Sequence, residues 1–139
     1  MSNIELLEKT LPVAPLKIVA MESCRELGQK VNDYIVSFRE NTISEASESS
    51  LYVNYRSNNY LVDCCCPRFG TGEAKGVLRE TIRGTDLFIM TDVCNYSLTY
   101  SVSGHLNHMS PDDHYQDLKR IISAATGKAH RINVIMPFL

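Results

Sequence analysis

The sequence predicts an α/β domain in which helices flank a parallel β-sheet. Residues 86–91 form an almost continuous apolar run, which is typical of a central parallel strand that is buried on both faces. A helix with a strong start signal at Ser110 is followed, after a short link, by a second apolar run at residues 132–136. Strand, helix and strand in this order form a βαβ unit, whose two strands lie parallel in one sheet.

The N-terminal part of the chain predicts a strand followed by a helix. Residues 16–21 are a short apolar run, which we expect to be the first buried strand. Ser23 and Glu26 have the spacing of a capping box, so a helix is expected from there to about Arg39. Its buried face is expected to consist of residues one turn apart: Leu27, Val31, Tyr34 and Ile35. Residues 41–50 are rich in Ser, Glu and Asn and predict either a loop or a helix cap region.

The middle of the chain predicts a β-hairpin as an extension at the edge of the sheet. Residues 52–55 and 60–66 are rich in strand-forming residues, and the turn signal Ser-Asn-Asn at 57–59 lies between them. Residues 73–80 alternate weakly and predict a further short strand. Residues 94–109 mix Tyr, Leu, Val and His with small polar residues and predict no particular element.

The last helix has both of its ends marked. Ser110 is a good cap and Pro111 occupies the first helical position, where its missing N–H costs nothing. Gly127 is the natural stop. The buried face is expected to comprise Tyr115, Leu118, Ile121, Ile122 and Ala125.

Composition limits the class of protein. A chain of 139 residues is long enough for one domain with its own core. The net charge of −2 argues against a broad basic surface for nucleic acid, and no apolar run is long enough to cross a membrane. The N-terminus lacks a signal-peptide pattern, and the five cysteines do not suggest a disulfide framework. We therefore expect a cytoplasmic protein that binds neither nucleic acid nor membrane.

Two clusters invite a metal interpretation, and in both the alternative is favoured. Consecutive strand residues point to opposite faces, so Cys64, Cys65 and Cys66 are better explained as small buried residues. His105 and His108 have a spacing that would place both on one side of a helix, but no strong metal motif accompanies them. We expect no metal ligand in this chain.

The order of motifs in residues 68–90 resembles the N-terminal half of the ribose-phosphate pyrophosphokinase family. The loop Phe69–Glu73 is similar to that family's Phe-Ser-Asp-Gly-Glu loop, and residues 80–86 are similar to its Glu-Ser-x-Arg-Gly-x-Asp stretch before a hydrophobic strand. Residues 121–128 and 131–138 resemble the family's next helix and strand. The matching segments are separate from one another and together span the chain from Leu16 to Leu139.

The resemblance implies a phosphoribosyltransferase-like fold and a role in nucleotide biosynthesis. Residues 1–139 would be the N-terminal domain of a two-domain synthetase whose C-terminal domain is absent from this chain. The implied activity is transfer of pyrophosphate from ATP to ribose 5-phosphate, with Mg²⁺, in a homo-oligomer (a hexamer in the family). Phe69 and Glu73 would hold the adenine of ATP across a subunit interface, through ring stacking and a carboxylate acceptor. Thr71 stands where the family has a third, acidic contact.

A second implied site is an allosteric phosphate site at Thr81 and Arg83, which match the family's Ser-x-Arg-Gly stretch. An arginine can hold phosphate bidentately and a threonine can donate its hydroxyl. The alternative is that Arg83 pairs with a nearby acid, Glu80 or Asp86. For the first site, the alternative is a turn with a packed Phe69 and a solvated Glu73.

Several departures from the family limit what this chain is expected to do alone. The chain ends before the family's Arg-Gln segment, its metal-binding His and its acidic ribose-phosphate loop. We assign no catalytic residue here and expect the fragment alone to be inactive. Thr71 and the long stretches 41–60 and 94–109 support a rival interpretation, a non-catalytic regulatory relative of the synthetase. A third is an unrelated α/β nucleotide-binding domain.

Overall fold

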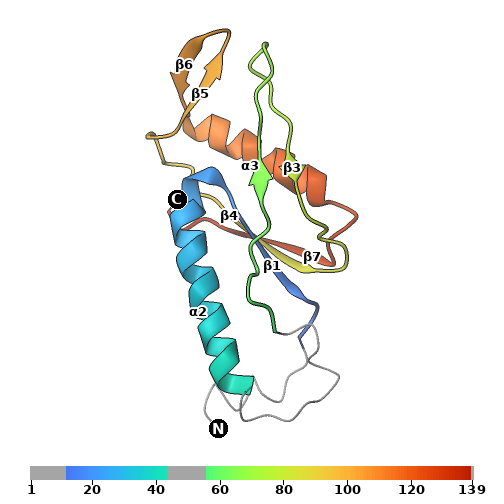
Figure 1. The fold of residues 1–139 in the computed structure, drawn as a ribbon. Helices are drawn as coiled ribbons and strands as arrows, with labels where there is room; N and C mark the ends of the chain where they lie inside the picture. Colours follow the sequence, from blue (N-terminus) through green and yellow to red (C-terminus); the bar gives the residue numbers. More distant parts are fainter. Residues whose placement is uncertain (1–11, 44–55, 139) are drawn as a thin grey trace.

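The computed structural model describes residues 12–43 and 56–138, and its centre is a parallel β-sheet (Figure 1). The strand order is β1–β4–β7, with β1 at Leu16–Ala20, β4 at Asp86–Met90 and β7 at Arg131–Ile135. Both pairings are parallel, in the registers Leu16↔Asp86 and Asp86↔Arg131. The three predicted strands and the α/β class are confirmed, and the most apolar run lies in the middle.

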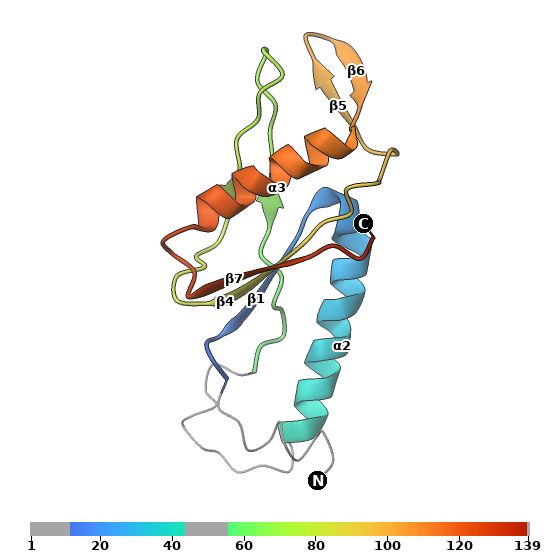
Figure 2. The ribbon, with the colours of Figure 1, turned by 180° about the vertical axis from the view of Figure 1, so that it is seen from behind.

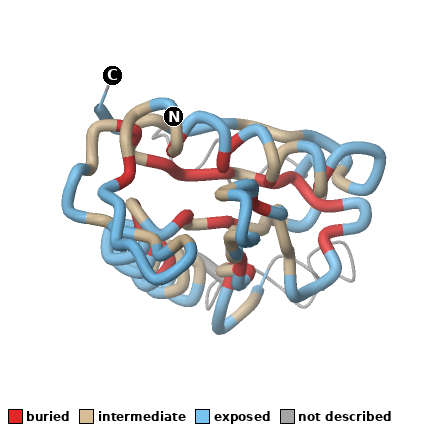
Figure 3. Tube along the Cα trace, turned by 90° about the horizontal axis from the view of Figure 1, so that it is seen from above, coloured by how far each residue is buried: buried red, intermediate tan, exposed pale blue. Residues whose placement is uncertain are grey.

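Helices cover the two faces of this sheet (Figure 2). Alternate side chains of β4 pack on the two faces of the sheet, because successive strand residues point to opposite faces. Leu87 and Ile89 pack in one core cluster with three residues of α3 (Pro111–Ala125), namely Leu118, Ile121 and Ala125. Met90 packs in the other cluster, against residues of α2 (Arg25–Ile43). Figure 3 shows the buried residues running through the centre, with exposed turns around them.

The β-rich segment at 60–66 forms two different pairings. Tyr60–Val62 lies along the outer edge of β1, where the Ile18 amide donates to the Tyr60 carbonyl and the Val62 amide donates to the Ile18 carbonyl, both at 2.8 Å. Strand β2 (Cys64–Cys65) then pairs antiparallel with β3 (Val77–Leu78). The expected first arm of the hairpin, residues 52–55, lies outside the described residues. Among the described residues, β2 pairs with β3, which is the short strand that was predicted within residues 73–80.

The predicted capping box at Ser23 is wrong. A short 3₁₀ turn, η1 (Glu22–Cys24), precedes α2, and its cap residue Met21 makes no side-chain capping bond. The Ser23 hydroxyl instead accepts a hydrogen bond from the Asp92 amide at 2.9 Å, in the loop after β4. A tertiary partner thus takes the hydroxyl that a local cap would use.

The buried face of α2 is narrower than predicted. Val31 and Ile35 pack on the core, but Leu27 is 41% exposed and Tyr34 is 72% exposed. The helix also continues to Ile43, beyond the expected end near Arg39. Among the helices in the described ranges, none is both long and apolar enough to cross a membrane.

Helix α3 begins as predicted. The Ser110 hydroxyl accepts from the Asp113 amide at 3.2 Å, and the Asp113 carboxylate accepts from the Ser110 amide at 2.9 Å, which completes a capping box. Gly127 adopts a positive φ of 76° directly after the helix, as expected of a stop. The predicted burial of Tyr115 is wrong, because this residue is 37% exposed.

Residues 94–109, for which the sequence predicted no particular element, contain a β-hairpin. Strands β5 (Thr99–Val102) and β6 (His105–His108) pair antiparallel and project from one end of the molecule (Figure 1). His105 and His108 therefore lie on a strand, where residues three apart point to opposite faces. The idea that a helix aligns both imidazoles is wrong. The loop between β2 and β3 projects in the same direction, beside this hairpin in both views.

Candidate functional site

The loop that carries Phe69, Thr71 and Glu73 is the tip of a tight hairpin. Arg68 and Ala74 are bridge partners, and the Phe69 amide donates to the Glu73 carbonyl at 2.7 Å. The Gly72 amide donates to the Phe69 carbonyl at 2.9 Å, and Gly72 has a φ of +87°, which glycine adopts without strain. This is a three-residue turn with a bulge at Gly72. It places Phe69 and Glu73 opposite each other.

The two faces of this hairpin differ in burial. The side chain of Arg68 is 7% exposed and Ala74 is 6% exposed, so this bridge pair points into the molecule. Phe69 is 51% exposed, and Glu73 is also exposed. Adjacent residues of a strand face opposite ways, so burial of the first pair directs the second pair outward. The alternative of a packed Phe69 does not describe this structure.

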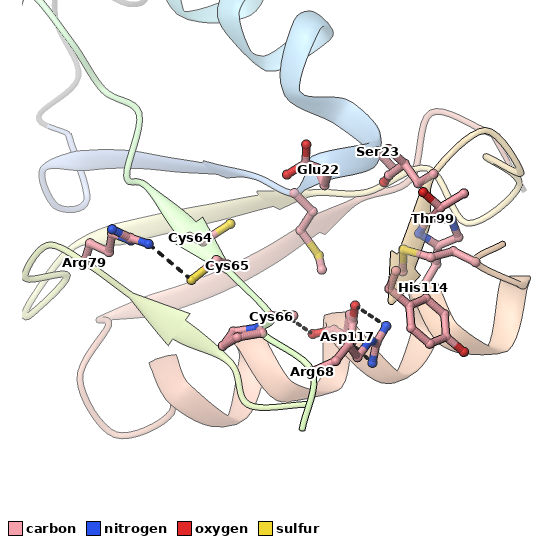
Figure 4. A pocket seen from close by; sticks show the side chains of 15 residues that line it. Glu22, Ser23, Cys64, Cys65, Cys66, Arg68, Arg79, Thr99, His114 and Asp117 are labelled. Carbon is pink, nitrogen blue, oxygen red and sulfur yellow. Dashed lines mark hydrogen bonds and ion pairs between the residues drawn. The ribbon is translucent and has the colours of Figure 1, made fainter. Parts of the chain in front are cut away.

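A buried ion pair anchors the hairpin to α3 (Figure 4). The Arg68 guanidinium donates to both Asp117 carboxylate oxygens, at 3.1 and 2.9 Å. Arg120 donates to the same carboxylate at 2.7 Å, and the Tyr100 ring of β5 lies 4.5 Å from the Arg68 guanidinium carbon. Sequence reasoning missed this cluster. The available signal was an acid, Asp117, on the apolar face of a predicted helix, four residues before Ile121.

Beside this ion pair lies a cavity of about 410 Å³ at the carboxyl end of β1. Figure 4 shows its walls, which come from the segment after β1, residues 64–68, β5 and α3. Two of its polar groups are already engaged: His114 Nε2 lies 2.7 Å from the Asn95 carbonyl oxygen, and Arg79 pairs with Asp63 at 3.2 Å. The cavity lining does not include Phe69, Thr71 or Glu73.

Two of the three cysteines that line this cavity, Cys64 and Cys66, are not set up as nucleophiles. Burial raises the pKa of the Cys64 thiol to about 11 and the pKa of the Cys66 thiol to about 12. Both thiols are therefore protonated at neutral pH, and the thiolate is the reactive form. Within residues 12–43 and 56–138, no three His, Cys, Asp or Glu side chains are arranged to hold a metal ion.

The second predicted pair, Thr81 and Arg83, lines a separate cavity of about 350 Å³. Lys75 and Lys128 line the same cavity, so three basic residues line it together with Glu80. The Thr81 hydroxyl oxygen accepts a long bond from the Arg83 amide, at 3.4 Å.

The acids proposed as alternative partners of Arg83 are engaged elsewhere. Glu80 lies 3.5 Å from Lys17, and Asp86 pairs with Arg131 at 2.6 Å. In the part of the chain that the structure describes, Arg83 forms no ion pair with either acid. Neither acid therefore neutralises Arg83, which is one of the residues that line the cavity.

A comparison with protein families identifies the family of this chain. Residues 16–139 match the family model for the N-terminal domain of ribose phosphate pyrophosphokinase. No curated protein matches the chain. The match covers the three strands of the parallel sheet, helices α2 and α3 and both candidate sites, which is most of the chain. The chain therefore belongs to the family of N-terminal domains of ribose phosphate pyrophosphokinase.

Proposed function

We propose that this chain supplies part of the ATP site of a cytoplasmic, homo-oligomeric ribose-phosphate diphosphokinase. In the proposed reaction, the 1-hydroxyl oxygen of ribose 5-phosphate attacks the β-phosphorus of ATP. The bond from that phosphorus to the oxygen bridging the α-phosphate breaks, and AMP leaves. The hydroxyl proton is lost, and phosphoribosyl pyrophosphate forms. Family membership supports a transferase of nucleotide biosynthesis, and the reaction itself is our proposal.

The outward-facing pair Phe69 and Glu73 is the observation that carries the proposal. An exposed aromatic ring offers a stacking face to adenine, and an exposed carboxylate can accept from its exocyclic amine. The pair lies on the loop between β2 and β3, which projects from the molecule (Figure 1), and it does not line the cavity of about 410 Å³. This arrangement suits contact with a nucleotide bound on a neighbouring subunit. Thr71 is the middle residue of the same turn and offers a hydroxyl in place of the family's acid.

Mg²⁺ enters this proposal with the phosphates of ATP. The described residues contain no cluster of ligands that fits a bound divalent cation. We therefore assign no metal ligand and no catalytic residue to this chain. Its proposed contribution is to bind and orient the adenine, which places the phosphates for in-line attack.

We further propose that Thr81 and Arg83 form an anion site for an allosteric phosphate. The support is that three basic residues line one cavity and that, among the described residues, Glu80 and Asp86 pair with other cations than Arg83. A guanidinium holds a phosphate through two parallel hydrogen bonds. Lys75 and Lys128 would add charge without fixed geometry.

The deciding experiment measures AMP release from ATP and Mg²⁺, with and without ribose 5-phosphate, in the intact protein that carries this domain. AMP release that depends on ribose 5-phosphate, with phosphoribosyl pyrophosphate as co-product, is the expected result. A folded protein that releases no AMP would replace this proposal with the rival, a non-catalytic regulatory relative. The change at Thr71 would then be the first departure to examine.

A further inference from the structure

We infer that Arg68 is a positioning residue for adenine-nucleotide binding, because its guanidinium fixes the direction of the loop that carries Phe69 and Glu73. The inference rests on the proposed role of that loop in ATP binding. The Arg68 side chain points away from the outer face of the loop, so its proposed effect on the nucleotide is indirect, through Phe69 and Glu73.

The contacts of Arg68 tie the hairpin to two distant elements. Asp117 of α3, 49 residues away in sequence, receives two hydrogen bonds from the guanidinium, and both side chains are only 7% exposed. Tyr100 of β5 lies against the same guanidinium at 4.5 Å. A planar arginine can make the bidentate bond and the ring contact together, whereas a lysine cannot.

The tip of the loop has little other support from the rest of the molecule. Its main-chain bonds, Phe69 to Glu73 and Gly72 to Phe69, are internal to the turn. Among the described residues, the one side-chain bond to the tip from another element comes from the Ser103 hydroxyl to the Gly70 carbonyl, at a weak 3.5 Å. The internal bonds keep the shape of the turn, and Arg68 sets where the turn points.

Loss of this anchor should affect nucleotide binding more than folding. Asp117 keeps a second partner, Arg120, at 2.7 Å, so removal of Arg68 does not leave the buried carboxylate without a cation. Without this anchor the loop can change direction, and the Phe69 ring takes many orientations. ATP binding must then order the loop, which weakens the binding. Arg120 shares the carboxylate but lies on α3 itself, so it provides a matched control.

The test compares Arg68→Met, Arg68→Lys and Arg120→Gln in the intact protein. For Arg68→Met we expect the KM for ATP to rise about tenfold, the ratio that corresponds to 1.4 kcal/mol of lost binding. The KM for ribose 5-phosphate should stay unchanged. Arg68→Lys should recover part of the loss, since it keeps the charge without the bidentate geometry. Arg120→Gln should leave both KM values unchanged.

Amide hydrogen exchange of the loop supplies a readout that needs no activity. The amides of Phe69, Gly72 and Lys75 donate in the hairpin, and they should exchange faster in Arg68→Met than in Arg120→Gln. Equal exchange and equal KM values in these two variants would overturn the inference. If Phe69→Ala leaves the KM for ATP unchanged while Arg68→Met still speeds exchange, the loop has no adenine role and Arg68 is only a structural anchor. That result would overturn the inference whether or not the protein releases AMP. Failure of the inference can therefore be distinguished from failure of the proposed function.

Discussion

The Phe69 amide donates to the Glu73 carbonyl at 2.7 Å, so these two residues are opposite partners across a three-residue turn. This bond gives the ring and the carboxylate a fixed relation to each other. The neighbouring pair, Arg68 and Ala74, is buried and turns the first pair toward solvent. The candidate adenine contacts therefore depend on both a local turn and a distant anchor.

Phe69→Ala should weaken ATP binding in the intact protein. We expect the KM for ATP to rise about tenfold, since stacking of a base on an aromatic ring contributes about 1–3 kcal/mol. The KM for ribose 5-phosphate should not change, because that substrate has no base. Tyr96→Ala is a suitable control, as Tyr96 is an aromatic residue with 61% exposure outside this loop. Steady-state kinetics with each substrate varied in turn would check this, and an unchanged KM for ATP would contradict it.

Arg83→Ala should weaken the binding of inorganic phosphate at the proposed anion site. A bidentate guanidinium contact to an anion is lost, and the remaining lysines supply only unfixed charge. Titration of phosphate by calorimetry should show binding weakened at least about tenfold, equal to 1.4 kcal/mol. Lys30→Ala provides a matched control, because Lys30 is an exposed cation on α2, away from this cavity. Equal phosphate binding in wild type and Arg83→Ala would remove Arg83 from the site.

Asp86→Asn should destabilise the domain at neutral pH by about 1–3 kcal/mol, the usual range for hydrogen bonds to a charged group. The Arg131 guanidinium lowers the pKa of Asp86, with a further contribution from Asn133, and the carboxylate is largely buried. Asp63→Asn is the control, since Asp63 pairs with Arg79 at a site where both side chains are well exposed. It should change the free energy of unfolding by less than about 1 kcal/mol.

The effect of Asp86 should also depend on pH. A lowered pKa in the folded state means that ionisation stabilises the fold above the ordinary carboxyl pKa near 4. This stabilisation is lost as the pH falls through the lowered folded-state pKa of Asp86. Urea unfolding at pH 7 and at pH 2.5 should therefore show the difference between wild type and Asp86→Asn shrink at the lower pH. A constant difference would show that the charge of Asp86 does not stabilise the fold.

Gly76→Ala should destabilise the fold because Gly76 lies directly against the backbone of α3. An added Cβ would sit 2.5 Å from the Arg120 carbonyl oxygen, which cannot move without shifting the helix. We expect a loss of about 1–3 kcal/mol, as for other overpacked sites. Gly70→Ala is the matched control, since nothing lies within 4 Å of its added Cβ. Thermal unfolding of both variants would check this, and equal midpoints would contradict the close approach.

Cys64 and Cys66 should resist alkylation in the folded domain. With a pKa of about 11, Cys64 is thiolate in only about one molecule in a thousand at pH 8, and with a pKa of about 12 Cys66 is still less ionised. Iodoacetamide labelling at pH 8, followed by peptide mass spectrometry, should find both unlabelled in buffer and labelled in urea. If both cysteines were labelled as fast in buffer as in urea, the segment that contains Cys64 and Cys66 would open easily in the folded domain.

Local patterns predicted the elements whose signals are contained in a few neighbouring residues. The apolar run of β4 predicted a central strand, and Ser110 with Pro111 predicted the start of α3, because a cap and its helix are adjacent in the chain. The motif order around Phe69 and Arg83 also led to the family, and the family match covers both. These features needed no knowledge of distant contacts.

Tertiary structure alone decided the features that join segments far apart in sequence. Ser23 bonds to the loop after β4 instead of capping α2, and Arg68 meets Asp117 across 49 residues. Neither contact has a local signature, since each depends on where two separate elements pack. The sequence by itself thus determined the three strands of the parallel sheet, the start of the C-terminal helix and the candidate residues. Packing decided which face of the loop turns outward, because burial of Arg68 against α3 leaves Phe69 and Glu73 in solvent.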